Sequence, residues 1–213
     1  MGVQKMGKNA KGALMDTLVA LCKTKALHKI TVTDLLREAG VTRNAFYAMF
    51  RDINDLICCI YWERIAAPHW MSLTTSYDDY YMANLLSLKK VRNHYGPFLL
   101  QALEMRGQNC LQEYILKRTV DFEFRCAKKY FTPETYDELA FALRFNAYGW
   151  INTRMEWIQG GMGEPVELLA RRITNARMAL ISGFMPDQRN VEAFRNSTDL
   201  VEINPNHHLE ESH

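Results

Sequence analysis

Long apolar runs are missing from this 213-residue sequence, because charged residues interrupt every hydrophobic stretch before it reaches the roughly 20 residues that a membrane helix requires. A secretory signal is missing too. The basic N-terminus passes directly into an amphipathic pattern, without an apolar core or a small-residue cleavage site. We therefore expect a cytoplasmic protein with no membrane partner, and its hydrophobic content of 48% is enough to build a core.

Motifs that carry chemistry are scarce as well. The five cysteines contain no CxxC pair and no spacing with histidine that suits zinc, so neither a metal site nor another cofactor is expected. The residues that could serve an enzyme stand in no recognised nucleophile, base or metal spacing; they are His69, His94, Cys58, Cys59, Asp78 and Asp79. The sequence therefore predicts no catalytic residue and no enzyme.

Alternation of apolar and polar residues, the pattern of a half-buried strand, is almost absent. Apolar residues instead recur every three or four positions nearly throughout the chain. We predict an all-α fold of about nine helices. They are expected over residues 9–25, 32–39, 42–50, 52–74, 79–93, 96–106, 108–131, 133–159 and 165–184.

Charge is unevenly distributed along the chain. Residues 1–56 carry nine Lys and Arg against five Asp and Glu, a net charge of +4, whereas residues 57–213 carry 17 against 19, a net charge of −2. A basic N-terminal segment followed by a mildly acidic remainder indicates that the N-terminal segment binds a polyanion.

Residues 31–51 have the pattern of a helix-turn-helix. Thr31, with Asp34 three positions on, forms a capping box that starts a short helix, and Gly40 suits the left-handed position that ends it. A second helix begins near residue 42, and its apolar residues can face inward; they are Val41, Ala45, Phe46, Met49 and Phe50. The outward residues are then Thr42, Arg43, Asn44, Tyr47 and Arg51. No acid lies between residues 38 and 52, as contact with a phosphate backbone demands.

The segment TVTDLLREAGVTRNAFYAMFRDINDLI, residues 31–57, resembles the N-terminal DNA-binding domain of the TetR/AcrR family of transcriptional regulators. The resemblance covers about residues 10–57 and implies a helix-turn-helix DNA-binding domain over residues 1–52. It also implies a helical domain over residues 53–186 that binds a small effector and dimerises. Residues 187–213 are polar, and we expect a mobile tail there.

The resemblance also assigns roles in DNA binding. Thr42, Arg43 and Asn44 would face the DNA groove, while Tyr47 and Thr33 would contact phosphates. Thr31 would add a phosphate-binding site at the N-terminal end of its helix. For Arg43 two interpretations stay open, because its guanidinium could read a guanine edge or bind a phosphate.

One position departs from the family pattern. The family commonly has a phosphate-binding lysine at the start of the fourth helix, where this sequence has Ile53. Arg51, two residues earlier, is the candidate replacement for the missing charge. Without it, DNA affinity would be weaker and its dependence on salt shallower.

The helix expected over 108–131 carries apolar residues on two faces, which is typical of a central helix. Arg118 and Arg125 fall in or beside one of these stripes, where a cation needs a partner. Either they bind an anionic ligand, or they form internal ion pairs with Glu104, Glu113 or Asp121. An aromatic-lined effector pocket is expected between the helices. Its candidate residues are Tyr95, Phe98, Met105, Arg118, Phe122, Arg125, Cys126 and Tyr148.

The last two long helices are predicted to form a homodimer interface. Small residues at three- and four-residue spacing allow a second helix to approach closely, and a broad apolar face lies on the preceding helix. The interface candidates are Ala176, Ala179, Gly183, Leu139, Leu143, Trp150 and Trp157.

These expectations together favour a ligand-responsive transcriptional repressor. Its partners would be a double-stranded, pseudo-palindromic DNA operator, a second copy of the chain and a small-molecule effector. The alternative is a DNA-binding regulator or architectural protein without a small-molecule effector, responding to a protein partner or to none.

Overall fold

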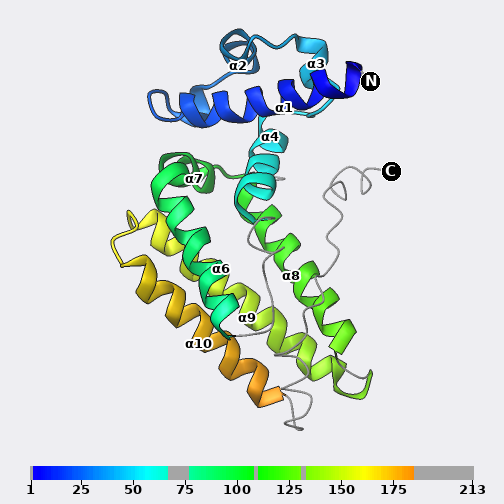
Figure 1. Ribbon diagram of the computed structural model, residues 1–213, viewed down its shortest axis with the longest axis vertical. Helices are drawn as coiled ribbons and strands as arrows, with labels where there is room; N and C mark the ends of the chain where they lie inside the picture. Colours follow the sequence, from blue (N-terminus) through cyan, green and yellow to red (C-terminus); the bar gives the residue numbers. More distant parts are fainter. Residues whose placement is uncertain (1, 67–76, 108–109, 131–132, 185–213) are drawn as a thin grey trace. The chain divides into compact units, whose positions relative to one another are not determined.

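The computed structural model describes residues 2–66, 77–107, 110–130 and 133–184 (Figure 1). All regular structure in these ranges is helical, which confirms the predicted all-α fold. None of the described helices is both long enough and apolar enough to cross a membrane. The described residues form two compact units. Unit 1 lies within Met1–Trp62 and His94–Tyr114, and unit 2 lies within Glu63–Asn93 and Ile115–His213.

Unit 1 contains the predicted helix-turn-helix. Its helices are α1 (Gly2–Leu21), α2 (Val32–Ala39), α3 (Arg43–Tyr47), α4 (Ile53–Ile60) and α7 (Gly96–Glu104), with a short 3-10 turn at Leu27–Lys29. Helix α1 packs against α2 and α4, and α2 packs against α3. The side chains at the centre of this packing are fully buried; they are Leu14, Leu18, Leu35, Phe46 and Leu56.

Local capping explains where the short helices of unit 1 begin and end. The expected capping box is present, because the Thr31 hydroxyl accepts a hydrogen bond from the Asp34 N–H and the Asp34 carboxylate accepts one from the Thr31 N–H. Gly40 ends α2 with φ 64°, a left-handed conformation that favours glycine. Asp52 caps α4 through the N–H of Asp55.

Two π-helical turns depart from the predicted regular helices. Helix α4 continues as a π-helical turn over Tyr61–Ala66, and α6 (Tyr77–Lys90) continues as another over Val91–Tyr95 before α7 begins. The chain passes between the two units inside these turns, at residues 62–63 and 93–94. A π-helical turn accommodates an extra residue and often marks a functional position in a helix.

Unit 2 is built on α6, α9 (Pro133–Gln159) and α10 (Val166–Phe184), together with most of α8 (Leu111–Tyr130). Helix α10 runs alongside α6 and also contacts α9 (Figure 1). Polar groups are buried in this packing. Arg154 donates a 2.9 Å hydrogen bond to the Ser87 hydroxyl, and the Arg177 guanidinium lies 5.0 Å from the centre of the Tyr80 ring.

Arg92 bonds to the backbone of the turn between α9 and α10. Gly161 and Met162 both have positive φ, 79° and 59°, which reverses the chain where the sequence predicted a helix stop. Arg92 donates hydrogen bonds to the carbonyl oxygens of Met162 and Glu164, at 2.6 and 2.8 Å. The Trp157 indole N–H donates to the same Glu164 carbonyl. The second π-helical turn is therefore anchored to the α9–α10 turn within unit 2.

Candidate nucleic-acid interface

The side chains of the α3 region divide between the core and the surface as the sequence predicts. Phe46 and Phe50 are buried, while the outward residues are exposed; these are Thr42, Arg43, Asn44, Tyr47 and Arg51. Tyr47 is 50% exposed, and its ring forms a T-shaped pair with the ring of Phe46, with centroids 5.2 Å apart. The buried Phe46 thus supports an aromatic hydroxyl held at the surface.

Helix α3 is shorter than predicted, ending at Tyr47 rather than near residue 50. The Met49 N–H already bonds to the Phe46 carbonyl, an i to i+3 bond that tightens the chain beyond the helix. At the other end, the Thr42 hydroxyl accepts a 3.3 Å hydrogen bond from the Ala45 N–H. The first turn of α3, where the base-reading candidates lie, is therefore capped.

Two predicted DNA contacts meet each other in the structure. The Arg43 Nη2 donates a 3.0 Å hydrogen bond to the Thr33 Oγ1, joining the first turn of α3 to the first turn of α2. Sequence spacing could not reveal this bond, because ten residues and a turn separate the partners.

Thr31 is already engaged within its own capping box. Its hydroxyl donates to Asp34 Oδ2 at 2.9 Å and accepts from the Asp34 N–H at 3.1 Å. Lys25 Nζ lies 2.7 Å from the same carboxylate oxygen. These hydrogen bonds, from Lys25 first and then from Thr31, hold the pKa of Asp34 well below its usual range. A phosphate at the start of α2 would lie beside the Asp34 carboxylate and would compete with it for the Thr31 hydroxyl. The contact between Thr31 and a phosphate stays a prediction.

Arg51 is exposed but not isolated. Its guanidinium lies 3.6 Å from an Asp55 carboxylate oxygen, and the Asp55 carboxylate also accepts a hydrogen bond from the Arg51 N–H. Ile53 is half-buried at the start of α4. Arg51, the candidate replacement for the missing lysine, is thus already paired with Asp55 of α4.

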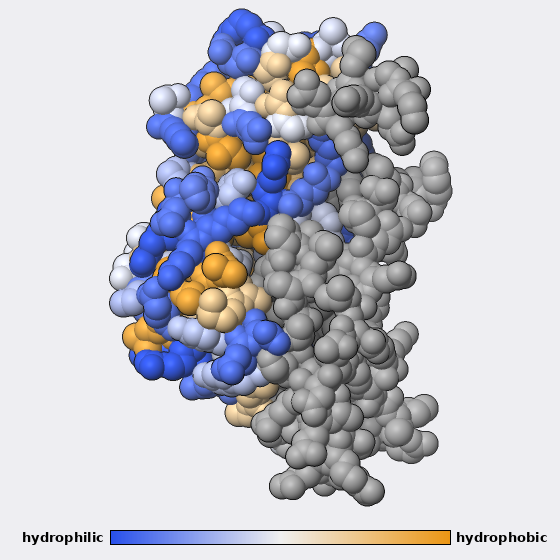
Figure 2. Space-filling model, in the orientation of Figure 1, coloured by the Kyte–Doolittle hydropathy of each residue, from blue (hydrophilic) through white to orange (hydrophobic). Residues whose placement is uncertain are grey.

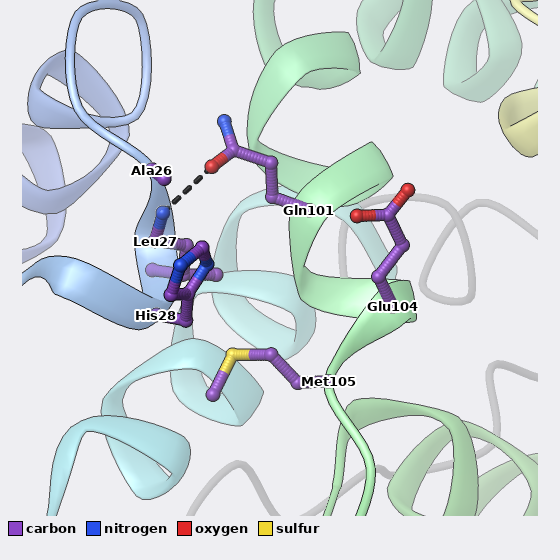
Figure 3. Close-up of a pocket in the computed structure, with 6 residues that line it drawn as sticks. All are labelled: Ala26, Leu27, His28, Gln101, Glu104 and Met105. Carbon is purple, nitrogen blue, oxygen red and sulfur yellow. Dashed lines mark hydrogen bonds between the residues drawn. The ribbon is translucent and has the colours of Figure 1, made fainter.

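A second feature of unit 1 is a pocket between the α1–α2 connection and the end of α7, with a volume of about 560 Å³ (Figure 3). Gln101 lies across it, accepting a 2.7 Å hydrogen bond from the Leu27 N–H and donating one of 2.8 Å to the Cys22 carbonyl. The pocket lining is Ala26, Leu27, His28, Gln101, Glu104 and Met105. Gln101 therefore ties α7 to the segment between α1 and α2, a contact that no sequence motif signals.

The predicted effector residues are divided between the units. Phe98 is buried and Tyr95 and Met105 are half-buried, all in unit 1, and Met105 lines the pocket described above. Arg118 is buried and Tyr148 is exposed, both in unit 2. The structure does not describe the side chains of Phe122, Arg125 and Cys126. The effector site stays a prediction.

The predicted dimer residues include both buried and exposed positions. Leu143 and Trp157 are buried, Trp150 is half-buried, and Ala176, Ala179 and Gly183 are exposed; Leu139 lies outside the described side chains. A different set of α9 residues forms an exposed aromatic stripe: Phe141, Phe145 and Tyr148 are 71%, 70% and 45% exposed. The rings of Phe141 and Phe145 stack with centroids 6.4 Å apart. Apolar residues line both sides of α9, so periodicity alone does not separate the exposed stripe from the core.

Two cysteines that the sequence left without a role are buried in unit 1. Burial raises the pKa of Cys22 to about 11 and is the main reason that the pKa of Cys58 rises to about 12. Both thiols are therefore protonated at neutral pH and poorly suited to act as nucleophiles.

No protein-family model and no curated protein matches the chain. Among solved structures, a chain described as "Dihydroxyacetone kinase operon activator DhaS" is similar, with a TM-score of 0.59 and 20% sequence identity. The match covers 82% of this chain and 97% of that chain. At this identity the likeness shows the fold alone, an all-helical one.

Proposed function

We propose that the protein is a homodimeric, ligand-responsive transcriptional regulator that binds a pseudo-palindromic DNA operator. The single observation that carries this proposal is the outward face of α3, where Thr42, Arg43, Asn44 and Tyr47 are all exposed on a capped helix that follows a tight turn. An ordinary solvated face more often carries Glu and Lys. The fold likeness to an operon activator supports the same class of function.

The chemistry of these side chains suits base readout. The planar guanidinium of Arg43 can pair with guanine O6 and N7, and the Asn44 amide can pair with adenine N6 and N7. The hydroxyl groups of Thr42 and Tyr47 can donate to phosphate oxygens and set the position of the head on the duplex. Each correct base pair read in this way is worth about 1–3 kcal/mol of discrimination.

Dimerisation through α9 and α10 is supported by the aromatic stripe on α9. The face drawn in Figure 2 carries hydrophobic areas among hydrophilic ones. Phe141, Phe145 and Tyr148 follow each other at helical spacing, and Phe141 and Phe145 have most of their area exposed. Exposed apolar patches of this kind mark interaction surfaces. The exposed Ala176 and Ala179 on α10 would allow the same helices of a second copy to approach closely.

Effector control would act through the chain segments that join the units. Helix α4 leaves unit 1 and enters unit 2 within its own π-helical extension, without an intervening loop. A small molecule that favours one arrangement of unit 2 can therefore change the fraction of molecules in which unit 1 is able to bind DNA. We propose repression by operator occupancy; activation is the second candidate, because the similar DhaS is described as an operon activator.

Fluorescence anisotropy with an operator selected from random DNA tests the DNA contacts. Arg43→Ala and Tyr47→Ala should each weaken binding at least about fivefold, the loss that one base or phosphate contact implies. Arg37→Ala is the matched control, because Arg37 is an exposed arginine of α2 outside the proposed contact set. Full affinity in both contact variants would overturn the assignment of α3 as the recognition helix.

Light scattering tests the dimer, and thermal shift tests the effector. The wild-type chain should be dimeric at micromolar concentration, and Phe141→Ser with Phe145→Ser should shift it towards a monomer. A monomeric wild type would contradict the dimer proposal. A metabolite screen in which no compound raises the melting temperature would favour a regulator without a small-molecule effector.

A further inference from the structure

We infer that Thr33 is a positioning residue for base readout, because it holds the guanidinium of Arg43 at the protein surface before DNA arrives. The inference rests on the proposed DNA-binding function and deepens it. The observation that carries it is the 3.0 Å hydrogen bond from Arg43 Nη2 to Thr33 Oγ1. The family pattern assigns Thr33 only a phosphate contact.

Both ends of this hydrogen bond stand on a constrained backbone. Thr33 lies in the first turn of α2, whose start is fixed by the Thr31–Asp34 capping box. Arg43 is the first helical residue of α3, directly after the Thr42 cap. Between the helices, Gly40 adopts its left-handed conformation and the Val41 N–H bonds to the Leu36 carbonyl. The distance from Thr33 to Arg43 is thus set by two caps and one tight turn.

The bond uses only part of the guanidinium. Arginine has five N–H donors in a planar fork, and one bond to a hydroxyl leaves donors for a guanine edge. A free arginine side chain samples many rotamers, which must be restricted when it binds a base. A partner that already restricts them lowers this entropic cost for the one geometry that fits guanine. Thr33 therefore contributes to specificity although it touches no base itself.

The Thr33 hydroxyl accepts the bond from Arg43 and keeps its own proton. That proton remains able to donate to a phosphate oxygen. Loss of a phosphate contact lowers affinity equally for all sequences, whereas loss of positioning lowers discrimination only at the base pair that Arg43 reads. The pattern of loss across base pairs, rather than the total affinity, identifies the positioning role.

The test measures the full-length chain on its selected operator and on operators substituted at each base pair of one half-site in turn. Arg43→Ala should flatten discrimination at a single base pair, by about 5- to 150-fold. Thr33→Val should reduce discrimination at that same base pair by about three- to tenfold, which lies within the range for one typical net hydrogen bond. Thr33→Ser keeps the hydroxyl and should retain the wild-type preference.

The double variant Thr33→Val with Arg43→Ala completes the cycle. If Thr33 acts through Arg43, the double variant should discriminate no worse at that base pair than Arg43→Ala alone. Melting curves for each variant show that the head is folded, and Thr33→Ala, which adds no methyl group, should repeat the effect of Thr33→Val.

A Thr33→Val loss that is equal at every base pair overturns the inference and leaves a phosphate contact alone. A Thr33→Val variant with unchanged discrimination overturns it as well. If Arg43→Ala itself leaves every base preference intact, base readout by Arg43 fails. The Arg43 variant reports that failure of the proposed function, so it is distinguishable from a failure of positioning.

Discussion

Replacing Arg51 with alanine is expected to make operator binding less sensitive to salt. Arg51 is exposed beside α3 and stands two residues before Ile53, the position where the TetR/AcrR pattern that this segment resembles has a phosphate-binding lysine. If its guanidinium contacts a phosphate, its removal means that fewer counterions are released when the complex forms.

The size of the effect follows from the number of phosphates lost. Each phosphate contact contributes about 0.9 to the slope of log affinity against log salt concentration, and a homodimer carries two copies of Arg51, so the slope should fall by about 1.8. Between about 0.05 M and 0.2 M salt, the wild type should therefore lose about 12-fold more affinity than Arg51→Ala.

The ion pair with Asp55 sets a second, smaller effect. Its nitrogen–oxygen distance is 3.6 Å and the Arg51 side chain is 67% exposed, so the pair is worth about 0.2–1 kcal/mol. Asp55→Asn keeps an oxygen that can accept from the Arg51 N–H but releases the guanidinium. Operator affinity should then rise by about 1.4- to 5-fold for each half-site, a gain that disappears when Arg51 is also replaced.

Anisotropy titrations over a series of salt concentrations measure both effects. Arg37→Ala is the matched control, because Arg37 is also 67% exposed and paired with an acid, so its removal changes the net charge equally. An Arg51→Ala slope equal to that of the wild type would refute the phosphate contact, and an equal change in Arg37→Ala would attribute the effect to net charge alone.

Three further predictions concern stability. Phe46→Ala should destabilise unit 1 by about 3–5 kcal/mol in urea unfolding, because the ring is fully buried, whereas the half-exposed Tyr47→Ala should cost far less; equal losses would contradict the core assignment. Because the pKa of Asp34 is lowered in the folded protein, its ionised carboxylate stabilises the fold at neutral pH, and this stabilisation is lost as the pH falls below the usual carboxyl pKa of about 4. Asp34→Asn should therefore make the free energy of unfolding less dependent on pH in that range. Arg92→Ala should destabilise unit 2 by about 1–3 kcal/mol, since it removes two hydrogen bonds to part-buried carbonyls of the α9–α10 turn; an unchanged unfolding midpoint would show that the turn does not need them.

Local signals in the sequence were enough to predict most of the helices of the described chain. Thr31 with Asp34 gives a capping box, Gly40 gives a left-handed stop, and Asp52 gives a cap, and each depends on neighbours within four residues. The outward and inward sides of α3 were predictable for the same reason, because helical periodicity alone decides them.

The features that escaped prediction depend on residues far apart in the chain or on small changes in helix geometry. Gln101 bonds to the α1–α2 connection across more than 70 residues, and the Arg43–Thr33 bond crosses a turn. The π-helical turns leave the apolar spacing nearly unchanged, so periodicity reads them as ordinary helix. On α9, tertiary packing rather than helical periodicity separates the exposed Phe141 and Phe145 from the buried Leu143.

Selection of bound sequences from random double-stranded DNA is the measurement that tests the central claim most directly. We expect the full-length protein to enrich a pseudo-palindrome whose half-sites lie about one helical turn apart or a multiple of it. We also expect Arg43→Ala to lose the preference at one base pair of each half-site. Recovery of no common sequence by the folded, dimeric wild-type protein would contradict a sequence-specific regulator.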